Sequence, residues 1–213
     1  MGEEEADTMT DRQTHWDTVY GTKGERDVSW FQDDPAPSLA LIALTGATAA
    51  SAIVDIGGGA SRLVDALLAR GHRALTVLDL SSAALATAQA RLGEAAGRVN
   101  WIVADVTAWQ PPATYDVWHD RAAFHFLTAP AEQAAYLARL KQALKVGGHA
   151  IIGTFALDGP EKCSGLPVTR HSTDSLATLL GPAFTPVDSR RHQHATPWQS
   201  VQNFQFSTFV RVH

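Results

Sequence analysis

Residues 52–61 read AIVDIGGGAS, a short apolar run that contains one acid and breaks into three consecutive glycines. An apolar run of this length is typical of a buried parallel strand. The next stretch, SRLVDALLAR at 61–70, repeats leucine and valine at helical spacing. Strand, glycine turn and helix together predict a nucleotide-binding βα unit. We expect the ligand to lie above the turn, because glycine lets the backbone bend sharply and approach a ligand closely.

The spacing of the glycines argues against a dinucleotide ligand. A GxGxxG fingerprint that starts at Gly57 needs a third glycine where Arg62 stands. A fingerprint that starts at Gly58 needs a glycine where Ala60 stands. Neither position fits, so the nicotinamide-binding interpretation is disfavoured.

An acid stands two residues before the first glycine, and a small residue closes the loop. This pattern resembles motif I of the class I S-adenosylmethionine-dependent methyltransferases. The resemblance implies an α/β fold with a Rossmann-like, doubly wound, seven-stranded sheet, a C-terminal antiparallel hairpin and three αβα layers. It also implies S-adenosylmethionine as the cofactor. The cofactor contacts that it implies here are Asp55, Gly57, Gly58, Gly59 and Ser61.

Acids also mark the ends of the second and third expected strands. The second, RALTVLDLS at 73–81, brings Asp79 close to the interval of roughly 20 residues at which an acid binds ribose in doubly wound folds. A carboxylate accepts both hydrogen bonds of a cis-diol, so we expect Asp79, with Leu80 beside it, to hold the sugar. In the resembled family, the acid at the position of Asp105 contacts the adenine amine, and Val106 would pack on the ring.

The fourth expected strand, YDVWHD at 115–120, ends where methyl and acceptor meet in the resembled family. Its tip departs from the (D/N/S)PP(Y/F) signature of methyltransferases that act on nucleobases and glutamine. His119 is either a general base that also contacts the cofactor or a structural histidine. Asp120 would orient or charge the site, and Arg121 would pair with Asp120 or with a substrate carboxylate.

The N-terminal part of the chain is rich in large aromatic residues. Trp16, Tyr20 and Trp30 either pack on the domain as an anchor or close over the cofactor. The pattern WDxxY followed by SWF resembles the N-terminal segment of several methyltransferase subfamilies, including some protein-lysine methyltransferases. We expect a disordered acidic tail over 1–10, a helical lid segment over 11–50 with Ser38 as a helix N-cap, and a single methyltransferase domain over 51–213.

Two further expectations concern the C-terminal part of the chain. The segment GPEKCSGLPV at 159–168 is too rich in proline and glycine for a long helix or strand, so it either shapes the substrate site or is an inert connection. Beyond it we expect a helix that ends at Leu180 with Ser172 as its cap. The helix before the fifth strand is expected to end at Gly147 and Gly148.

The composition of the chain narrows its class. The 213 residues, 45% hydrophobic, fit one well-cored domain, and the formal net charge of -5 gives no general attraction to nucleic acid. No stretch is long and apolar enough to predict a membrane span, which favours a cytoplasmic protein. The single cysteine, Cys163, agrees with a reducing compartment, and the spacing of the histidines is not that of a metal site.

The sequence therefore predicts an S-adenosylmethionine-dependent methyltransferase that acts on a small-molecule or protein side-chain acceptor. Two alternatives stay open from the sequence alone: a non-catalytic S-adenosylmethionine-binding adaptor and an NAD(P)-dependent oxidoreductase. Either a monomer or a dimer is compatible with the final strands.

Overall fold

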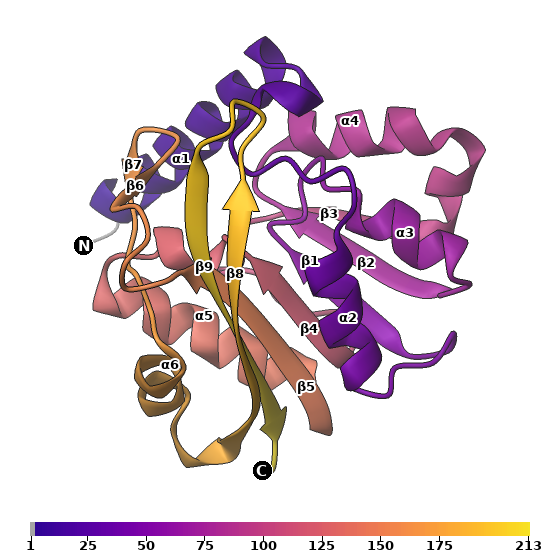
Figure 1. Cartoon of the computed structure of the whole chain (residues 1–213), viewed down its shortest axis with the longest axis vertical. Coiled ribbons are helices and arrows are strands. Elements are labelled where there is room, and N and C mark those ends of the chain that lie inside the picture. The colour runs from indigo at the N-terminus through magenta and orange to yellow at the C-terminus, as the bar shows by residue number, and fades with distance from the viewer. Residues whose placement is uncertain (1–2) are drawn as a thin grey trace.

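A seven-stranded mixed sheet runs through the centre of the computed structural model, which describes residues 3–213 (Figure 1). The strand order is β3-β2-β1-β4-β5-β9-β8. The parallel strands are β1 (Ala52–Ile56), β2 (Ala74–Asp79), β3 (Val99–Val103), β4 (Tyr115–Arg121) and β5 (Leu144–Phe155). The antiparallel strands β9 (Val201–Arg211) and β8 (Phe184–Ala195) extend the sheet as a hairpin. The Rossmann-like sheet with its C-terminal hairpin is confirmed.

Helices cover both faces of the sheet. One buried cluster joins it to α2 (Ala36–Leu44) and α3 (Leu63–Ala69), and α4 (Ser82–Leu92) adds Leu85. A second buried cluster on the other face contains α5 (Pro130–Ala143) and α6 (Thr173–Leu180). Neighbouring residues of β1 divide between the two clusters, because successive side chains of a strand point to opposite faces. The result is the expected αβα arrangement.

Three smaller parts complete the fold. The helix α1 (Glu3–Thr22) lies across one end of the sheet (Figure 1). The strands β6 (Lys162–Cys163) and β7 (Leu166–Pro167) form a separate two-stranded hairpin, which we call the strap. Short 3-10 turns are η1 (Glu25–Asp27), η2 (Gly93–Arg98), η3 (Phe124–Phe126) and η4 (Gly181–Ala183). Over residues 3–213, no helix has both the length and the apolar character that crossing a membrane requires.

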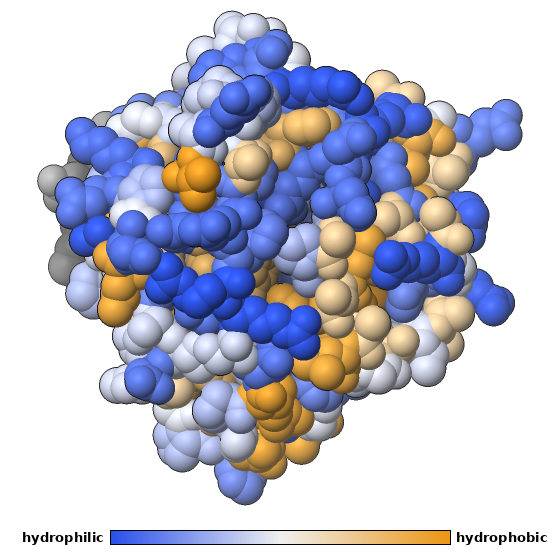
Figure 2. Space-filling model, in the orientation of Figure 1, coloured by the Kyte–Doolittle hydropathy of each residue, from blue (hydrophilic) through white to orange (hydrophobic). Residues whose placement is uncertain are grey.

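The edge strand β8 carries charged side chains outward. Arg190 and Arg191 are exposed, and Figure 2 shows hydrophilic side chains gathered over this part of the face. Charge on an edge strand discourages pairing with a strand of another molecule.

Several element boundaries differ from those expected. The helix α1 begins at Glu3 rather than after residue 10, and the sequence from 3 to 20 contains no glycine or proline that would end a helix. Residues 1–2 lie outside the described residues. The helix α2 begins at Ala36 with Pro35 as its N-cap. Pro37 lies in the first turn, where proline is tolerated, and so Ser38 is inside the helix and is not a cap.

The transition from α5 to β5 also comes earlier than predicted. The helix α5 ends at Ala143, not at the two glycines, because buried Leu144 already pairs with Tyr115 of β4. The register then shifts between Tyr115 and Val117, and Gly147 takes a φ of 81° within this irregular stretch. The glycines therefore form a bulge in the strand and do not end the helix. By contrast, the prediction that Ser172 caps α6 is confirmed.

A buried hydrogen-bond network fixes the turn after β4. Trp118 Nε1 donates to the hydroxyl of Tyr136 at 2.8 Å, and this hydroxyl donates to Asp120 Oδ2 at 2.7 Å. The backbone N–H groups of Ala123 and Phe124 also donate to the Asp120 carboxylate. Burial raises the pKa of Asp120 to about 6, and the donors of this network oppose the shift. The network thus holds β4, the turn and α5 together.

Replacing Tyr136 by phenylalanine tests this network. Tyr136→Phe leaves the Trp118 N–H without an acceptor and removes one donor from Asp120. We expect the free energy of unfolding, measured with urea, to fall by about 1–3 kcal/mol. Tyr115→Phe is the matched control, because the Tyr115 hydroxyl makes no hydrogen bond among residues 3–213. Equal losses in the two variants would contradict the assignment.

Candidate functional site

One cavity lies at the carboxyl ends of the parallel strands, beneath α1. It contains about 1090 Å³ of empty space, including the solvent at its mouth. Of the residues predicted to bind cofactor, it is lined by Trp16, Tyr20, Trp30, Asp55, Gly57, Gly58, Ser61, Asp79, Leu80, Asp105, Val106 and His119. Parallel strands explain this gathering, because their carboxyl ends meet at one edge of the sheet.

The glycine turn after β1 leaves no room for side chains. Gly57 has a φ of 63°, and a Cβ added there would lie 2.6 Å from the Cβ of Ala123. A Cβ on Gly58 would lie 2.6 Å from Val77 and 2.7 Å from the Asp55 carboxylate. Gly59 is not part of the cavity wall, but its N–H donates to the Asp79 carboxylate. Glycine is therefore needed at these positions for the turn to pack against its neighbours.

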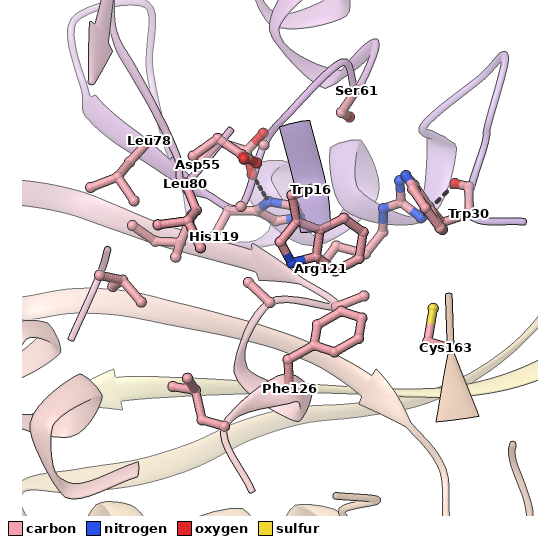
Figure 3. A pocket seen from close by; sticks show the side chains of 18 of the residues that line it. Trp16, Trp30, Asp55, Ser61, Leu78, Leu80, His119, Arg121, Phe126 and Cys163 are labelled. Atoms are coloured by element: carbon pink, nitrogen blue, oxygen red, sulfur yellow. Dashed lines mark hydrogen bonds and ion pairs between the residues drawn. The ribbon is translucent and has the colours of Figure 1, made fainter. Parts of the chain in front are cut away.

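A buried chain of three polar side chains supports the turn from below. His119 Nδ1 lies 2.7 Å from Asp55 Oδ1, and His119 Nε2 lies 2.9 Å from the hydroxyl of Ser38. Figure 3 shows the contact between His119 and Asp55 within the cavity wall. Since the carboxylate only accepts, Nδ1 donates to it and a neutral ring accepts from Ser38 at Nε2. Each ring nitrogen of His119 thus has a hydrogen-bond partner within the protein. A general base instead needs a ring nitrogen that is free to accept a proton from the substrate.

Asp79 ends β2 with its carboxylate buried at the cavity. The Ser81 N–H donates to Asp79 Oδ1 at 2.7 Å. Burial raises the pKa of Asp79 to about 7, because desolvation outweighs these donors and the charge of Asp55 adds to the shift. Ser81 caps α4 as expected, accepting from the Ala84 N–H at 3.1 Å. Asp79 is therefore a carboxylate that would gain from further hydrogen-bond donors.

Asp105 follows β3 and closes the same edge of the cavity. Its Oδ1 accepts from both the N–H and the hydroxyl of Thr107, each at 2.7 Å. These bonds fix the orientation of the carboxylate and occupy only one of its oxygens. Val106 lies beside it in the wall.

The helix α1 is held over the cavity at two points. Asp17 accepts from the hydroxyl of Ser81 at 2.7 Å and from the Ala83 N–H at 3.3 Å, at the start of α4. Arg12 forms an ion pair with Glu132 at the start of α5. The aromatic residues of this segment pack on the domain and also line the cavity. Packing on the domain and covering the cavity are therefore compatible roles for the same residues.

Aromatic contacts complete this cover. The Trp16 ring meets Trp30 edge-on at 5.6 Å and Phe126 at 5.0 Å. Trp30 Nε1 donates to the hydroxyl of Tyr20 at 3.1 Å. The segments before and after η1 therefore form one aromatic layer on the cavity.

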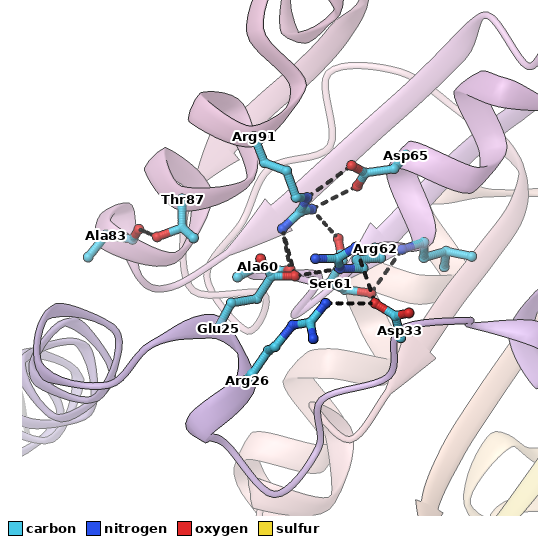
Figure 4. Close-up of polar contacts among 11 residues, drawn as sticks. Glu25, Arg26, Asp33, Ala60, Ser61, Arg62, Asp65, Ala83, Thr87 and Arg91 are labelled. Atoms are coloured by element: carbon cyan, nitrogen blue, oxygen red, sulfur yellow. Dashed lines mark hydrogen bonds and ion pairs between the residues drawn. The ribbon is translucent and has the colours of Figure 1, made fainter. Parts of the chain in front are cut away.

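An ion-pair cluster ties the glycine turn to this layer (Figure 4). Arg91 of α4 donates to the carbonyl oxygens of Ala60 and Ser61 at 2.9 Å each, and pairs with Asp65. Glu25 of η1 accepts from Arg62 at 2.7 Å and lies 3.3 Å from Arg91. The carbonyls that close the turn and the N-terminal segment are thus held by one guanidinium.

Asp120 and Arg121 do not form the pair that the sequence suggested. Asp120 is fully buried, lies outside the cavity and serves the network with Tyr136, so the expectation that it orients or charges the site is corrected. Alternation along β4 explains this, because residue 120 faces away from 119 and 121. Arg121 does line the cavity, and its Nη1 donates to the carbonyl of Trp30 at 3.1 Å.

Sequence reasoning missed part of the wall. The additional lining residues that come from distant segments are Arg12, Phe126, Phe155, Gln202 and Phe204. Cys163 of the strap, from the segment 159–168, also lines the cavity. Nothing local marks Gln202 or Phe204, which reach the cavity only because β9 pairs with β5.

Comparison with known proteins identifies a methyltransferase domain. Residues 53–148 match the family model described as a methyltransferase domain. The crystal structure of Burkholderia thailandensis 1,6-didemethyltoxoflavin-N1-methyltransferase, with bound 1,6-didemethyltoxoflavin and S-adenosylhomocysteine, is similar with a TM-score of 0.69. It shares 25% identity, and the match covers 99% of this chain and 90% of that chain. The chain therefore contains a methyltransferase domain, and over nearly its whole length it is similar to an S-adenosylmethionine-dependent methyltransferase.

Other solved structures agree with the fold of this methyltransferase. The N-methyltransferase NodS from Bradyrhizobium japonicum WM9 has a TM-score of 0.70 at 17% identity, covering 94% of this chain and 100% of that one. The glycopeptide N-methyltransferase MtfA has a TM-score of 0.64 at 16% identity, covering 86% and 93%. Among curated proteins, no sequence matches the methyltransferase significantly.

The raised pKa of Asp79 predicts a pH-dependent stability. The folded state holds a proton up to a pH of about 7, whereas the unfolded carboxyl loses it near 3.8. The stability that protonated Asp79 contributes is therefore complete below the unfolded pKa and is lost as pH rises through the folded pKa. At pH 8 we expect the free energy of unfolding of ligand-free Asp79→Asn, measured with urea, to exceed that of the wild type by up to roughly 4 kcal/mol. At pH 4 we expect the two proteins to have similar free energies of unfolding.

The control for this measurement is Asp34→Asn, at an exposed position. Its unfolding free energy should follow the wild type at both pH values. A ligand-free Asp79→Asn variant that is less stable than the wild type at pH 8 would contradict the expected sign.

Proposed function

We propose that this methyltransferase binds S-adenosylmethionine along the edge formed by β1, β2 and β3 and transfers its methyl group to a small molecule held in the remaining part of the cavity. The observation that carries the proposal is the gathering of Asp55, Asp79 and Asp105 around one glycine turn. Three acids at one end of a cavity suit a ligand that is cationic and rich in hydrogen-bond donors.

The residues present fit such a cofactor. Asp79 would accept from the two ribose hydroxyls, and these donors would stabilise a carboxylate whose pKa burial raises to about 7. The second oxygen of Asp105 would accept from the adenine amine, with Leu80 and Val106 against the ring. The backbone of the glycine turn and Ser61 would lie along the amino-acid part, because no Cβ separates them from it.

When bound, the cofactor supplies a sulfonium whose methyl group is electrophilic. A lone pair of the acceptor forms the new bond to the methyl carbon, and the electron pair of the broken carbon–sulfur bond returns to sulfur. A proton that the acceptor carries then leaves to solvent. The chain itself orients the acceptor and excludes water, through the layer of Trp16, Tyr20 and Trp30.

In this proposal His119 is a positioning residue. Its ring joins Asp55 to Ser38 and has no free nitrogen for the acceptor proton. It fixes the carboxylate against which the glycine turn packs, since a Cβ on Gly58 would meet that carboxylate.

A small-molecule acceptor is favoured over a protein side chain. The helix α1 is pinned at Asp17 and Arg12, and the strap closes the side at Cys163. The similar enzyme from Burkholderia thailandensis binds 1,6-didemethyltoxoflavin, a small molecule. A protein-lysine substrate, which the N-terminal segment suggested, would require the lid to open for a peptide. We also propose a cytoplasmic location, consistent with the free thiol of Cys163.

The role of Asp79 is tested by titrating the protein with S-adenosylhomocysteine in a calorimeter. At pH 8 we expect Asp79→Asn to weaken binding by roughly 100-fold, because each hydrogen bond to a charged group contributes about 1.5–3 kcal/mol. Wild-type affinity should also rise between pH 5.5 and pH 8 as Asp79 ionises. Asp34→Asn should bind like the wild type, and an unchanged Asp79→Asn affinity would refute the cofactor assignment.

The role of His119 is tested by two substitutions. His119→Asn keeps an N–H near the position of Nδ1 and removes a possible base, whereas His119→Phe removes the contact with Asp55. We expect the asparagine variant to keep S-adenosylhomocysteine affinity and turnover within about 10-fold, and the phenylalanine variant to lose both together. Turnover is measured by mass spectrometry after incubating a metabolite extract with methyl-deuterated cofactor.

The opposite pattern assigns a different role. If His119→Asn keeps affinity but loses more than about 100-fold in turnover, then His119 is a base. Absence of labelled product in the wild type, with binding intact, would favour the non-catalytic adaptor.

A further inference from the structure

Arg121 places a half-buried positive charge in the cavity wall without a carboxylate partner. Its Nη1 donates to the carbonyl of Trp30, and none of the ion pairs among residues 3–213 includes it. Burial lowers the pKa of Arg121, while the charge of the more distant Asp55 opposes the shift. Asp55 itself is already paired with His119. A guanidinium has five N–H donors, and among the described residues the Arg121 side chain makes one hydrogen bond, to Trp30.

The surroundings of Arg121 differ from the cofactor edge. Figure 3 shows its side chain reaching toward Trp30 and Cys163, on the other side of the cavity from Leu78 and Leu80. The wall there is aromatic and is made by Trp30, Phe126, Phe155 and Phe204. These residues come from the lid and from segments after β4, which do not carry the three acids. The cavity therefore has an acidic end and an aromatic end, and the aromatic end contains the guanidinium of Arg121, whereas the other lining arginine, Arg12, is already paired with Glu132.

A second polar group of this wall has no hydrogen-bond partner among the described residues. The side-chain oxygen of Gln202 is buried and accepts no hydrogen bond among the described residues. Gln202 lines the cavity from β9. A buried acceptor without a donor costs free energy, so a ligand that brings an N–H or O–H group would be favoured there.

We infer that Arg121 binds a carboxylate of the methyl acceptor, so that this methyltransferase acts on small organic acids with a planar apolar body. The inference rests on the proposed function. A guanidinium fork matches a carboxylate with two parallel hydrogen bonds, and the aromatic wall holds the body of the acid. Asp55, Asp79 and Asp105 repel an anion from the other end, which sets its direction in the cavity. The bound carboxylate is an anchor, and a different atom of the acceptor takes the methyl group.

The amino-acid part of the cofactor also contains a carboxylate. This carboxylate is the alternative partner for the Arg121 guanidinium. The position of the Arg121 side chain at Trp30 and Cys163 favours the acceptor. The two sources are separable, because S-adenosylhomocysteine contains this carboxylate and methylthioadenosine does not.

The first measurement uses the wild-type protein saturated with S-adenosylhomocysteine. Benzoate, phenylacetate and indole-3-acetate are titrated beside their primary amides, which have the same shape and no charge. We expect at least one acid to bind about 10-fold or more tightly than its amide, as charge-assisted hydrogen bonds imply. If no acid is preferred over its amide, the inference is overturned, and this result needs no variant.

The second measurement compares Arg121→Gln, Arg121→Lys and the control Arg73→Gln, whose side chain is exposed. We expect glutamine at 121 to abolish the preference for acids, lysine to keep part of it, and the control to keep all of it. Affinity for S-adenosylhomocysteine should stay within about 3-fold of the wild type in each folded variant. Circular dichroism checks the folding.

Loss of S-adenosylhomocysteine affinity in Arg121→Gln, with methylthioadenosine affinity unchanged, would overturn the inference and assign the guanidinium to the cofactor. Failure of the proposed function gives a different result, because the wild type would then not bind S-adenosylhomocysteine at all.

Discussion

The buried contact between Asp55 and His119 is the constraint on which the site depends. A carboxylate at the end of a central strand is costly to bury without a partner, and here the neighbouring strand β4 supplies one. Ser38 of α2 satisfies the far side of the ring. Three elements are thereby fixed relative to one another directly beneath the glycine turn. Because Gly58 lies against the same carboxylate, the turn inherits its position from this contact.

The N-terminal segment and the cofactor edge behave as one unit in this arrangement. The Ser81 hydroxyl, which caps α4, donates to Asp17 of α1. The backbone N–H of Ser81 donates to Asp79. Arg91 holds the carbonyls that close the glycine turn and contacts Glu25 of η1. A shift of the lid therefore disturbs Asp79 and the glycine turn. The aromatic residues of the lid line the cavity, while its polar residues Asp17 and Glu25 hold the lid against α4.

Much of the fold and half of the site follow from local patterns in the sequence. Apolar runs that end in acids predicted β1, β2 and β3, and parallel strands necessarily bring such ends to one edge. The alternation of side chains along β4 is sufficient to predict that Asp120 points away from the cavity, because residues 119 and 121 share one face of the sheet and residue 120 lies on the other. The boundary of α2 was less accessible, because proline in the first turn moved Ser38 from the expected cap to the interior.

The sequence by itself determined the nucleotide-binding βα unit, the acids of the cofactor edge and the family that they resemble. Only the tertiary structure decided that the Ser38 hydroxyl contacts His119 Nε2 and that Asp120 is buried in the core. It also decided that Arg121 lies among aromatic residues and has no carboxylate partner. The physical reason is the distance along the chain over which each interaction acts. Glycine turns, caps and strand periodicity act between near neighbours in the chain, whereas Gln202, Cys163 and Arg121 come to line one cavity only after the sheet has been assembled from strands far apart in sequence.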